Sequence, residues 1–281
     1  MAHPRGKRRQ NRGRQELMGP TKALIPCGGK GTRMTSFTKG AAKELLPIVG
    51  VPLVLRVMEE CAASGVREVL IVSAPGKEDL NDTVRAAAGN AGMPERVEVV
   101  TQENPRGLAD AIRLGRDFMG SDTFGVALPD NLFLGDEPAL AQLFRIQEHT
   151  AKNVVAIVEL GAADRHRYGP TAIYPGHLNG DEYVIESIPD KGPRQSTFDL
   201  EGAASAFTGV GRYVFLPEVF SAIDEVGSTL SRAKELDDIP VMQMLLHAGR
   251  LTGCRIRGDF LDVGLPTGYR EAEERLARPK R

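Results

Sequence analysis

A glycine-rich segment early in the chain is the first feature that could carry chemistry. It reads Gly-Gly-Lys-Gly-Thr-Arg over residues 28–33, and a second cation, Lys43, follows ten residues after Arg33. Glycines let backbone N–H groups close around a phosphate because no Cβ blocks the approach. With two cations the segment suits a triphosphate; the alternative is a strand–helix turn with solvated charges. It is neither the dinucleotide fingerprint, whose last glycine would fall at Met34, nor a P-loop, which closes on Gly-Lys-Ser/Thr.

The elements that must position this segment are predicted to alternate between strands and helices. Short apolar runs predict strands, and helical apolar spacing predicts helices. The expected strands lie at 23–26, 69–72, 97–100, 124–128 and 154–158, and the expected helices at 52–64, about 78–88, 108–119 and 139–149. This alternation indicates an α/β fold with a Rossmann-like, mostly parallel sheet and helices on both faces. Ligands bind beyond the carboxyl ends of such strands, so the loops after them are the candidate site.

The second half of the chain predicts a smaller, more β-rich part. Hairpins are expected over 168–188, with turns at Pro175-Gly176 and Asn179-Gly180. Further elements are expected as a strand at 211–215, helices near 217–226 and 239–248, late strands containing Ile256 and Phe260, and a helix at about 267–278. We expect one continuous domain over 21–281, with a nucleotide-binding half to about residue 160 and a substrate-binding half over 161–281.

Composition excludes several classes of protein. The 281 residues carry 36 Lys+Arg against 37 Asp+Glu, so a chain-wide cationic field for nucleic acid is absent. No apolar run reaches the roughly 18–20 residues that span a bilayer. The three cysteines are widely spaced and odd in number, which favours reduced thiols and a cytoplasmic location. Residues 1–20 are rich in Arg and Lys and are expected to be a disordered basic tail; an anion-binding arm is the alternative.

Several blocks of the sequence, taken in order, resemble the sugar-1-phosphate nucleotidyltransferases. The glycine-rich segment is followed, after nine residues, by Lys-Glu-Leu-Leu-Pro at 43–47. The further matching blocks are Gln102 with 107–111, Leu-Pro-Asp-Asn at 128–131, Tyr-Gly at 168–169, Gly-Arg-Tyr at 211–213, Asp-Val-Gly at 262–264 and Gly-Tyr at 268–269. The resemblance spans residues 22 to about 275 and implies the nucleotide-diphospho-sugar transferase fold.

The resemblance also implies a reaction and a set of site residues. An oxygen of a sugar 1-phosphate attacks the α-phosphorus of a nucleoside triphosphate, and pyrophosphate leaves. The implied roles are triphosphate binding by Gly28, Gly29, Gly31 and Thr32; catalysis by Arg33, Lys43, Asp130 and Lys191; base recognition by Gln102 and Gly107; sugar-phosphate binding by Gly169, Asp190, Lys191 and Gly211; and one Mg²⁺ on Asp130 and Asp262. A homo-oligomer is implied, with neither nucleic acid nor membrane as partner.

Several of the implied site residues also have a simpler, structural explanation. Asp130 could be a helix cap or a turn residue, Asp262 a turn residue or an ion-pair partner, and Gln102 a solvent-facing side chain. The pair Asp190-Lys191 stands where the family has Glu-Lys-Pro, or it is an unrelated loop pair. If it matches, the carboxylate sits roughly 1–1.5 Å further back than that of Glu, which favours a modified sugar or a cyclitol phosphate over glucose.

The sequence leaves the base and the activity class open. Some blocks look closer to thymidylyltransferases and others to uridylyltransferases, and uracil and thymine differ by one methyl, worth only about 1 kcal/mol. Two other classes of protein stay open: a catalytically inactive relative that binds nucleotides or nucleotide sugars, and a nicotinamide-dependent dehydrogenase, against which the missing third glycine argues.

Overall fold

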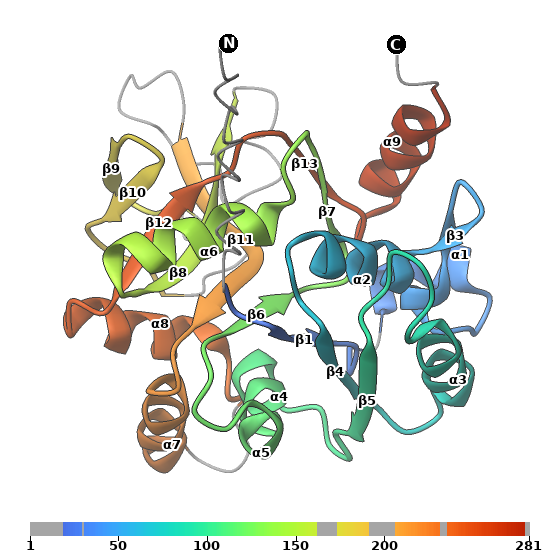
Figure 1. Ribbon diagram of the computed structural model, residues 1–281, viewed down its shortest axis with the longest axis horizontal. Coiled ribbons are helices and arrows are strands. Elements are labelled where there is room, and N and C mark those ends of the chain that lie inside the picture. The colour runs from blue at the N-terminus through green and yellow to red at the C-terminus, as the bar shows by residue number, and fades with distance from the viewer. Residues whose placement is uncertain (1–18, 30, 162–172, 191–205, 231–234, 279–281) are drawn as a thin grey trace, which may run out of the picture.

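A nine-stranded sheet forms the centre of the molecule in this computed structural model (Figure 1). The structure describes residues 19–29, 31–161, 173–190, 206–230 and 235–278. The strand order is β5-β4-β1-β6-β11-β8-β12-β10-β9, and within this sheet β10 and β11 run opposite to the other strands. The predicted α/β fold with a mostly parallel sheet is therefore confirmed.

The described strands and helices have the following bounds. The strands of the large sheet are β1 Lys22–Pro26, β4 Glu68–Ser73, β5 Arg96–Thr101, β6 Phe124–Ala127, β8 Asn153–Leu160, β9 Gly176–Asn179, β10 Glu182–Ile185, β11 Ala206–Phe215 and β12 Leu251–Arg255. Two small antiparallel sheets pair β2 Pro47–Ile48 with β3 Val51–Pro52 and β7 Asn131–Leu134 with β13 Asp259–Asp262. The helices are α1 Thr35–Thr38, α2 Leu53–Ala63, α3 Glu78–Ala87, α4 Leu108–Arg113, α5 Arg116–Met119, α6 Ala139–Thr150, α7 Val219–Thr229, α8 Asp238–His247 and α9 Pro266–Ala277, with short 3₁₀ turns at Thr32–Met34 and Lys43–Leu45.

Two hydrophobic cores lie on opposite faces of the sheet. Successive residues of a strand point to opposite faces, and in β1 Ala23 and Ile25 join one core whereas Leu24 joins the other. Helices α2, α3, α6 and α9 pack into the first core, and α4, α5, α7 and α8 into the second. Figure 1 shows α4, α5 and α7 grouped on one side of the sheet. Strands covered on both faces must be apolar throughout, which explains the continuous apolar runs of β1 and β4.

Strands from the second half of the chain enter the same sheet. β11 lies between β6 and β8, and β12 pairs with β8 in parallel. One sheet therefore runs through both predicted halves, and the division at residue 160 stays a prediction. Among the described residues, no helix has the length and apolar character needed to span a bilayer.

The predicted elements are wrong in several details. The single helix expected over 108–119 is two, α4 and α5, which are separated by a turn at Leu114 and Gly115. Gly115 lies so close to β1 that a Cβ there would be 2.7 Å from Leu24 Cδ1. Gly176 opens strand β9 instead of making a turn, whereas the turn at Gly180 is confirmed. β11 begins at Ala206, well before the expected 211–215; its first residues alternate between buried and half-buried, so no continuous apolar run marks its start. Ile256 lies one residue beyond β12, and residues 168–172 of the expected hairpins lie outside the described residues.

Asp238, at the start of α8, is expected to make the fold's stability fall as pH rises. Desolvation and the neighbouring Asp237 raise the pKa of Asp238 to about 7, against an ordinary value of 3.8, although Tyr213 donates a hydrogen bond to its Oδ2 at 2.9 Å. Between pH 4 and 7 this carboxyl thus holds more proton in the folded protein than in the unfolded chain. Stability should drop across that window by up to roughly 4 kcal/mol and level off above it.

The measurement is the melting temperature from pH 4.5 to 8 for the wild type and Asp238→Asn. The variant should lose this component of the pH dependence, whereas Asp117→Asn, at an exposed position in α5, should keep it. If the melting temperatures of the wild type and Asp238→Asn changed with pH in the same way, Asp238 would not be the group responsible.

Candidate active site at the carboxyl edge of the sheet

The glycine-rich loop follows β1 and packs against two side chains that the sequence assigns to the site. A Cβ at residue 28 would lie 2.8 Å from Gln102 Oε1, so only Gly28 allows this approach. Gly31 has φ +62°, and a Cβ there would press on the Lys43 side chain at 3.2–3.3 Å. The structure thus brings the loop, Gln102 and Lys43 together, as the sequence predicts. Thr32 and Arg33 follow in an exposed 3₁₀ turn.

Lys43 and Asp130 form an ion pair at the centre of this edge. Lys43 Nζ donates to Asp130 Oδ2 at 2.6 Å, and each side chain is 15% exposed. Burial works against both charges, yet Asp130 raises the pKa of Lys43, and Lys43 with Arg33 lowers the pKa of Asp130. Both groups therefore stay charged at neutral pH.

Asp262 faces Asp130 from the neighbouring strand β13. A Cβ at Gly264 would lie 3.0 Å from Asp130 Oδ2 and 3.1 Å from Asp262 Oδ1, so oxygens of both carboxylates border one small space. The Val263 N–H donates to the Asp130 carbonyl at 2.9 Å, which fixes the two strand ends together. Burial and the charge of Asp130 raise the pKa of Asp262. Two converging carboxylates, of which Asp130 already pairs with Lys43, form a donor set for a hard cation.

The donor set fits Mg²⁺ and not a metal held by protein groups alone. Within the described part of the chain, no three His, Cys, Asp or Glu side chains gather as metal ligands. Mg²⁺ commonly takes one or two carboxylates and completes its shell with water and substrate phosphates. Asp130 and Asp262 match that pattern. The simpler alternatives hold in part, since Asp130 pairs with Lys43 and Asp262 Oδ1 accepts from the Gly264 N–H at 3.1 Å, but they do not account for the convergence of the two carboxylates.

Gln102 is buried, so the alternative of a solvent-facing side chain is wrong. It is 4% exposed, and its Nε2 donates to Asp110 Oδ2 at 2.7 Å. Arg106 and Arg113 donate to the other oxygen of Asp110 at 2.9 and 2.7 Å, and with Gln102 they lower the pKa of that carboxyl against the effect of burial. A carboxylate accepts only, so the amide NH₂ must face Asp110 and the amide oxygen must face Gly28.

Arg212 holds the loop that carries Asp130, and the sequence did not assign it to the site. Its guanidinium is 0% exposed, pairs with both oxygens of Glu60 at 2.8–2.9 Å, and donates to the carbonyls of Leu128 and Asn131 at 2.9 and 2.8 Å. The bulge in β11 that contains Arg212 also places the Gly211 N–H 2.9 Å from Asn131 Oδ1. Gly211 thus meets the 128–131 loop; it contacts no group assigned to sugar binding among the described residues.

Of the remaining predicted site residues, Asp190 and Gly107 lie within the described part of the chain and two others do not. Asp190 is exposed, and its Oδ1 accepts from Gln243 Nε2 at 2.9 Å. Gly107 has φ +116°, and a Cβ there would overlap the Leu236 carbonyl, so this glycine serves a close approach of two backbones. Gly169 and Lys191 lie outside the described residues, and their roles stay predictions.

A second missed residue is Lys77, in the loop between β4 and α3. Its Nζ donates to the carbonyls of Cys27 and Gly29 at 2.5 and 2.9 Å and to Glu44 Oε2 at 2.9 Å. Its position in the loop after a predicted strand was the available signal, because such loops meet at one edge of the sheet.

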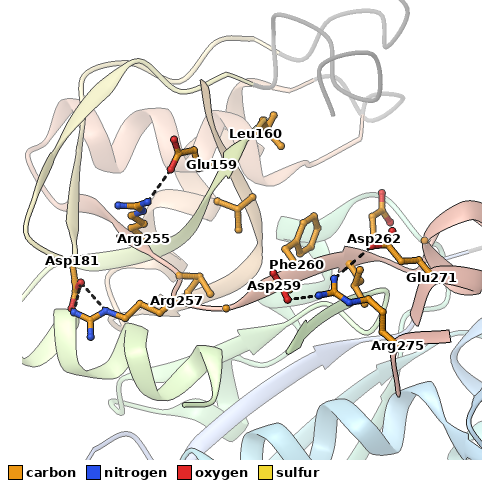
Figure 2. A pocket seen from close by; sticks show the side chains of 15 residues that line it. Glu159, Leu160, Asp181, Arg255, Arg257, Asp259, Phe260, Asp262, Glu271 and Arg275 are labelled. Atoms are coloured by element: carbon orange, nitrogen blue, oxygen red, sulfur yellow. Dashed lines mark hydrogen bonds and ion pairs between the residues drawn. The ribbon is translucent and has the colours of Figure 1, made fainter. Parts of the chain in front are cut away.

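A cavity of about 620 Å³ lies beside Asp262, between the ends of β8 and β12, strand β13 and helix α9. Figure 2 shows that its arginines point to carboxylates: Arg255 pairs with Glu159, Arg257 with Asp181 and Arg275 with Asp259. Within the described part of the cavity lining, these three cations are already paired with carboxylates. The glycine-rich loop, Lys43, Asp130 and Asp262 therefore form the candidate site.

Comparisons with known proteins agree with this geometry. A family model described as nucleotidyl transferase matches residues 22–278. The chain is 31% identical over 266 residues to UTP–glucose-1-phosphate uridylyltransferase 2 of Staphylococcus saprophyticus, covering 88% of this chain and 89% of that protein. It is 28% identical to the UTP–glucose-1-phosphate uridylyltransferase of Bacillus subtilis, with 88% of each covered.

A solved structure also resembles the fold. A crystal structure of a UDP-glucose pyrophosphorylase in complex with UDP-glucose superposes with a TM-score of 0.75 at 26% identity, covering 92% of this chain and 98% of that one.

Proposed function

This chain belongs to the nucleotidyl transferase family, and on that premise we propose that it transfers a uridylyl or thymidylyl group from UTP or dTTP to a sugar 1-phosphate. The products are a nucleotide sugar and pyrophosphate. The observation that carries this proposal is the convergence of Lys43, Asp130 and Asp262 beside the glycine-rich loop.

The residues of the site would act mainly by positioning and by charge. Two polyanions must meet, so cations and backbone N–H groups aimed at phosphate oxygens are the main requirement. Gly28, Gly29 and Gly31 would offer N–H groups to the triphosphate, and Lys43 and Arg33 would offer positive charge. Mg²⁺, when bound, would be held by Asp130 and Asp262 and would supply positive charge next to the reacting phosphates.

The orientation of Gln102 supports UTP or dTTP over CTP and ATP. Asp110 turns the amide so that its oxygen accepts at the place where the base would lie. Uracil and thymine present an N–H between two carbonyl oxygens, whereas the matching ring nitrogens of cytosine and adenine only accept. A buried acceptor facing an acceptor leaves both unpaired, which disfavours CTP and ATP.

The sugar would lie toward Asp190, and this position is expected to select it. Gln243 holds Asp190 Oδ1 at 2.9 Å, so the short carboxylate is anchored from α8. Asp190→Glu should raise the ratio of kcat/KM for glucose 1-phosphate over the preferred sugar phosphate by about tenfold, because the longer side chain reaches a glucose hydroxyl. Glu186→Asp, an opposite change on the same stretch, is the control. An unchanged ratio would mean that residue 190 does not meet the sugar.

The proposed reaction is tested by pyrophosphate release with Mg²⁺, crossing UTP, dTTP, ATP, GTP and CTP with a panel of sugar and cyclitol 1-phosphates. We expect release with UTP or dTTP and little with CTP or ATP. Triphosphate binding without release in any pair would favour an inactive, nucleotide-binding relative.

Two further properties are proposed from the resemblance and the composition. We expect a homo-oligomer, which sedimentation measures directly. The three cysteines are buried and free, which agrees with reduced thiols in a cytoplasm.

A further inference from the structure

Lys77 joins two segments that the proposed function assigns to phosphate binding. Its ammonium has three N–H groups, and all three have acceptors: the carbonyls of Cys27 and Gly29 in the glycine-rich loop, and the carboxylate of Glu44. Glu44 directly follows Lys43 in the same 3₁₀ turn. One cation therefore sets the position of the loop relative to Lys43.

The hydrogen bonds from Lys77 also orient the backbone N–H groups of the loop. In a trans peptide the carbonyl and the next N–H point in opposite directions, and no described peptide bond is cis. Because the Cys27 carbonyl points at Lys77, the Gly28 N–H points away from it. Among the described residues, no group accepts from the N–H of Gly28, Gly29 or Gly31. The loop thus keeps its carbonyls on Lys77 and its N–H groups open for a ligand.

The pair with Glu44 is enclosed. The side chain of Lys77 is 12% exposed and that of Glu44 is 1% exposed. Glu44 Oε1 is buried and has no hydrogen-bond partner in the described part of the chain, so the bond from Lys77 to Oε2 is the direct ion pair of this carboxylate. A solvated surface lysine would not be held in this way.

We infer that Lys77 is a positioning residue for the triphosphate: it holds the loop carbonyls inward and so presents the loop N–H groups and Lys43 to the phosphates. This inference rests on the proposed function, because it assumes that the loop binds a triphosphate. Lys77 itself contacts no reacting atom.

The test measures the Kd of UTP by calorimetry for Lys77→Met, with Lys22→Met as the matched control. Lys22 is 18% exposed and also binds a carbonyl, of Phe118, and a carboxylate, of Asp122, but at the amino end of β1. Lys77→Met should raise the Kd by about tenfold or more, because an unheld loop must be ordered on binding. Lys22→Met should leave the Kd unchanged, and KM for the sugar phosphate should move less than twofold in either variant.

Two further variants separate positioning from stability. Lys77→Met leaves Glu44 buried without a countercharge, so its melting temperature should fall; adding Glu44→Gln should restore the melting temperature but not the Kd. Lys77→Cys treated with 2-bromoethylamine gains a thioether analogue of lysine and should recover UTP affinity. The treated wild type is the control, since its own cysteines are buried.

An unchanged Kd in Lys77→Met, or recovery of the Kd together with stability in the double variant, would overturn the inference. A third outcome is that the wild type binds UTP but releases no pyrophosphate, whereas Lys77→Met binds UTP more weakly. This outcome would contradict the proposed reaction and leave the inference standing. A wild type that binds neither UTP nor dTTP would overturn both.

Discussion

Asp262→Asn is expected to abolish nearly all turnover and yet leave the fold as stable as the wild type or more so. The variant removes one of two converging carboxylates, and loss of such a charge should lower kcat by about 10²–10³-fold or more. Burial and Asp130 raise the pKa of Asp262, which means that its ionised form destabilises the fold. A neutral amide of the same size relieves this repulsion. The measurements are pyrophosphate release and the melting temperature without added divalent cation.

Asp130→Asn should lose turnover equally but should also lower the melting temperature. Its carboxylate is the ion-pair partner of Lys43 at 2.6 Å, and the variant leaves that ammonium enclosed without a countercharge. Asp259→Asn is the control, because Asp259 lies on the same strand, β13, but pairs with Arg275 away from the site. Near-normal turnover in both Asp262→Asn and Asp130→Asn would show that these carboxylates hold no catalytic cation.

Arg212→Met should be the most destabilising of the single substitutions considered, by about 3–5 kcal/mol. It removes the counterion of Glu60 and the donor to three backbone carbonyls, those of Leu128, Asn131 and Gly211. Because these carbonyls flank Asp130, the variant should also lower kcat in whatever fraction stays folded. Chemical denaturation gives the loss of stability, and pyrophosphate release per folded molecule gives the loss of activity.

Two comparisons make this prediction specific. Adding Glu60→Gln to Arg212→Met removes the orphaned charge and should recover part of the stability. Arg255→Met breaks an exposed pair with Glu159 and should cost less than about 1 kcal/mol. Equal effects for Arg212→Met and Arg255→Met would mean that the buried position of Arg212 does not matter.

The sequence predicted the large sheet well because most of its strands are short apolar runs covered on both faces. β1, β4, β6 and β8 and helices α2, α3 and α6 follow from the sequence pattern. The glycine-rich loop and Lys43 were also predictable, because the glycines and the cations lie within 16 residues of one another in the sequence. The prediction failed at Gly176, which serves a close approach between elements and not a turn, and at Gly115, where a turn interrupts the expected helix.

The groups that hold the site in place could not be predicted, because each acts across long stretches of sequence. Arg212 and Glu60 lie 152 residues apart, and Gln243 and Asp190 lie 53 apart. The sequence alone does not show which of many charged residues meet in the fold. Lys77 is similar: its three acceptors are visible only when the loops after β1 and β4 are placed side by side.

The central claim, that this edge of the sheet joins a nucleotide to a sugar phosphate, is tested most directly by ³¹P NMR of the protein with Mg²⁺, UTP and a panel of sugar 1-phosphates, repeated with dTTP. We predict that a nucleotide sugar diphosphate and pyrophosphate appear in equal amounts and only when both substrates are present. Pyrophosphate that appears without a sugar phosphate would show hydrolysis in place of transfer and would contradict the account. Unchanged spectra throughout the panel would also contradict it.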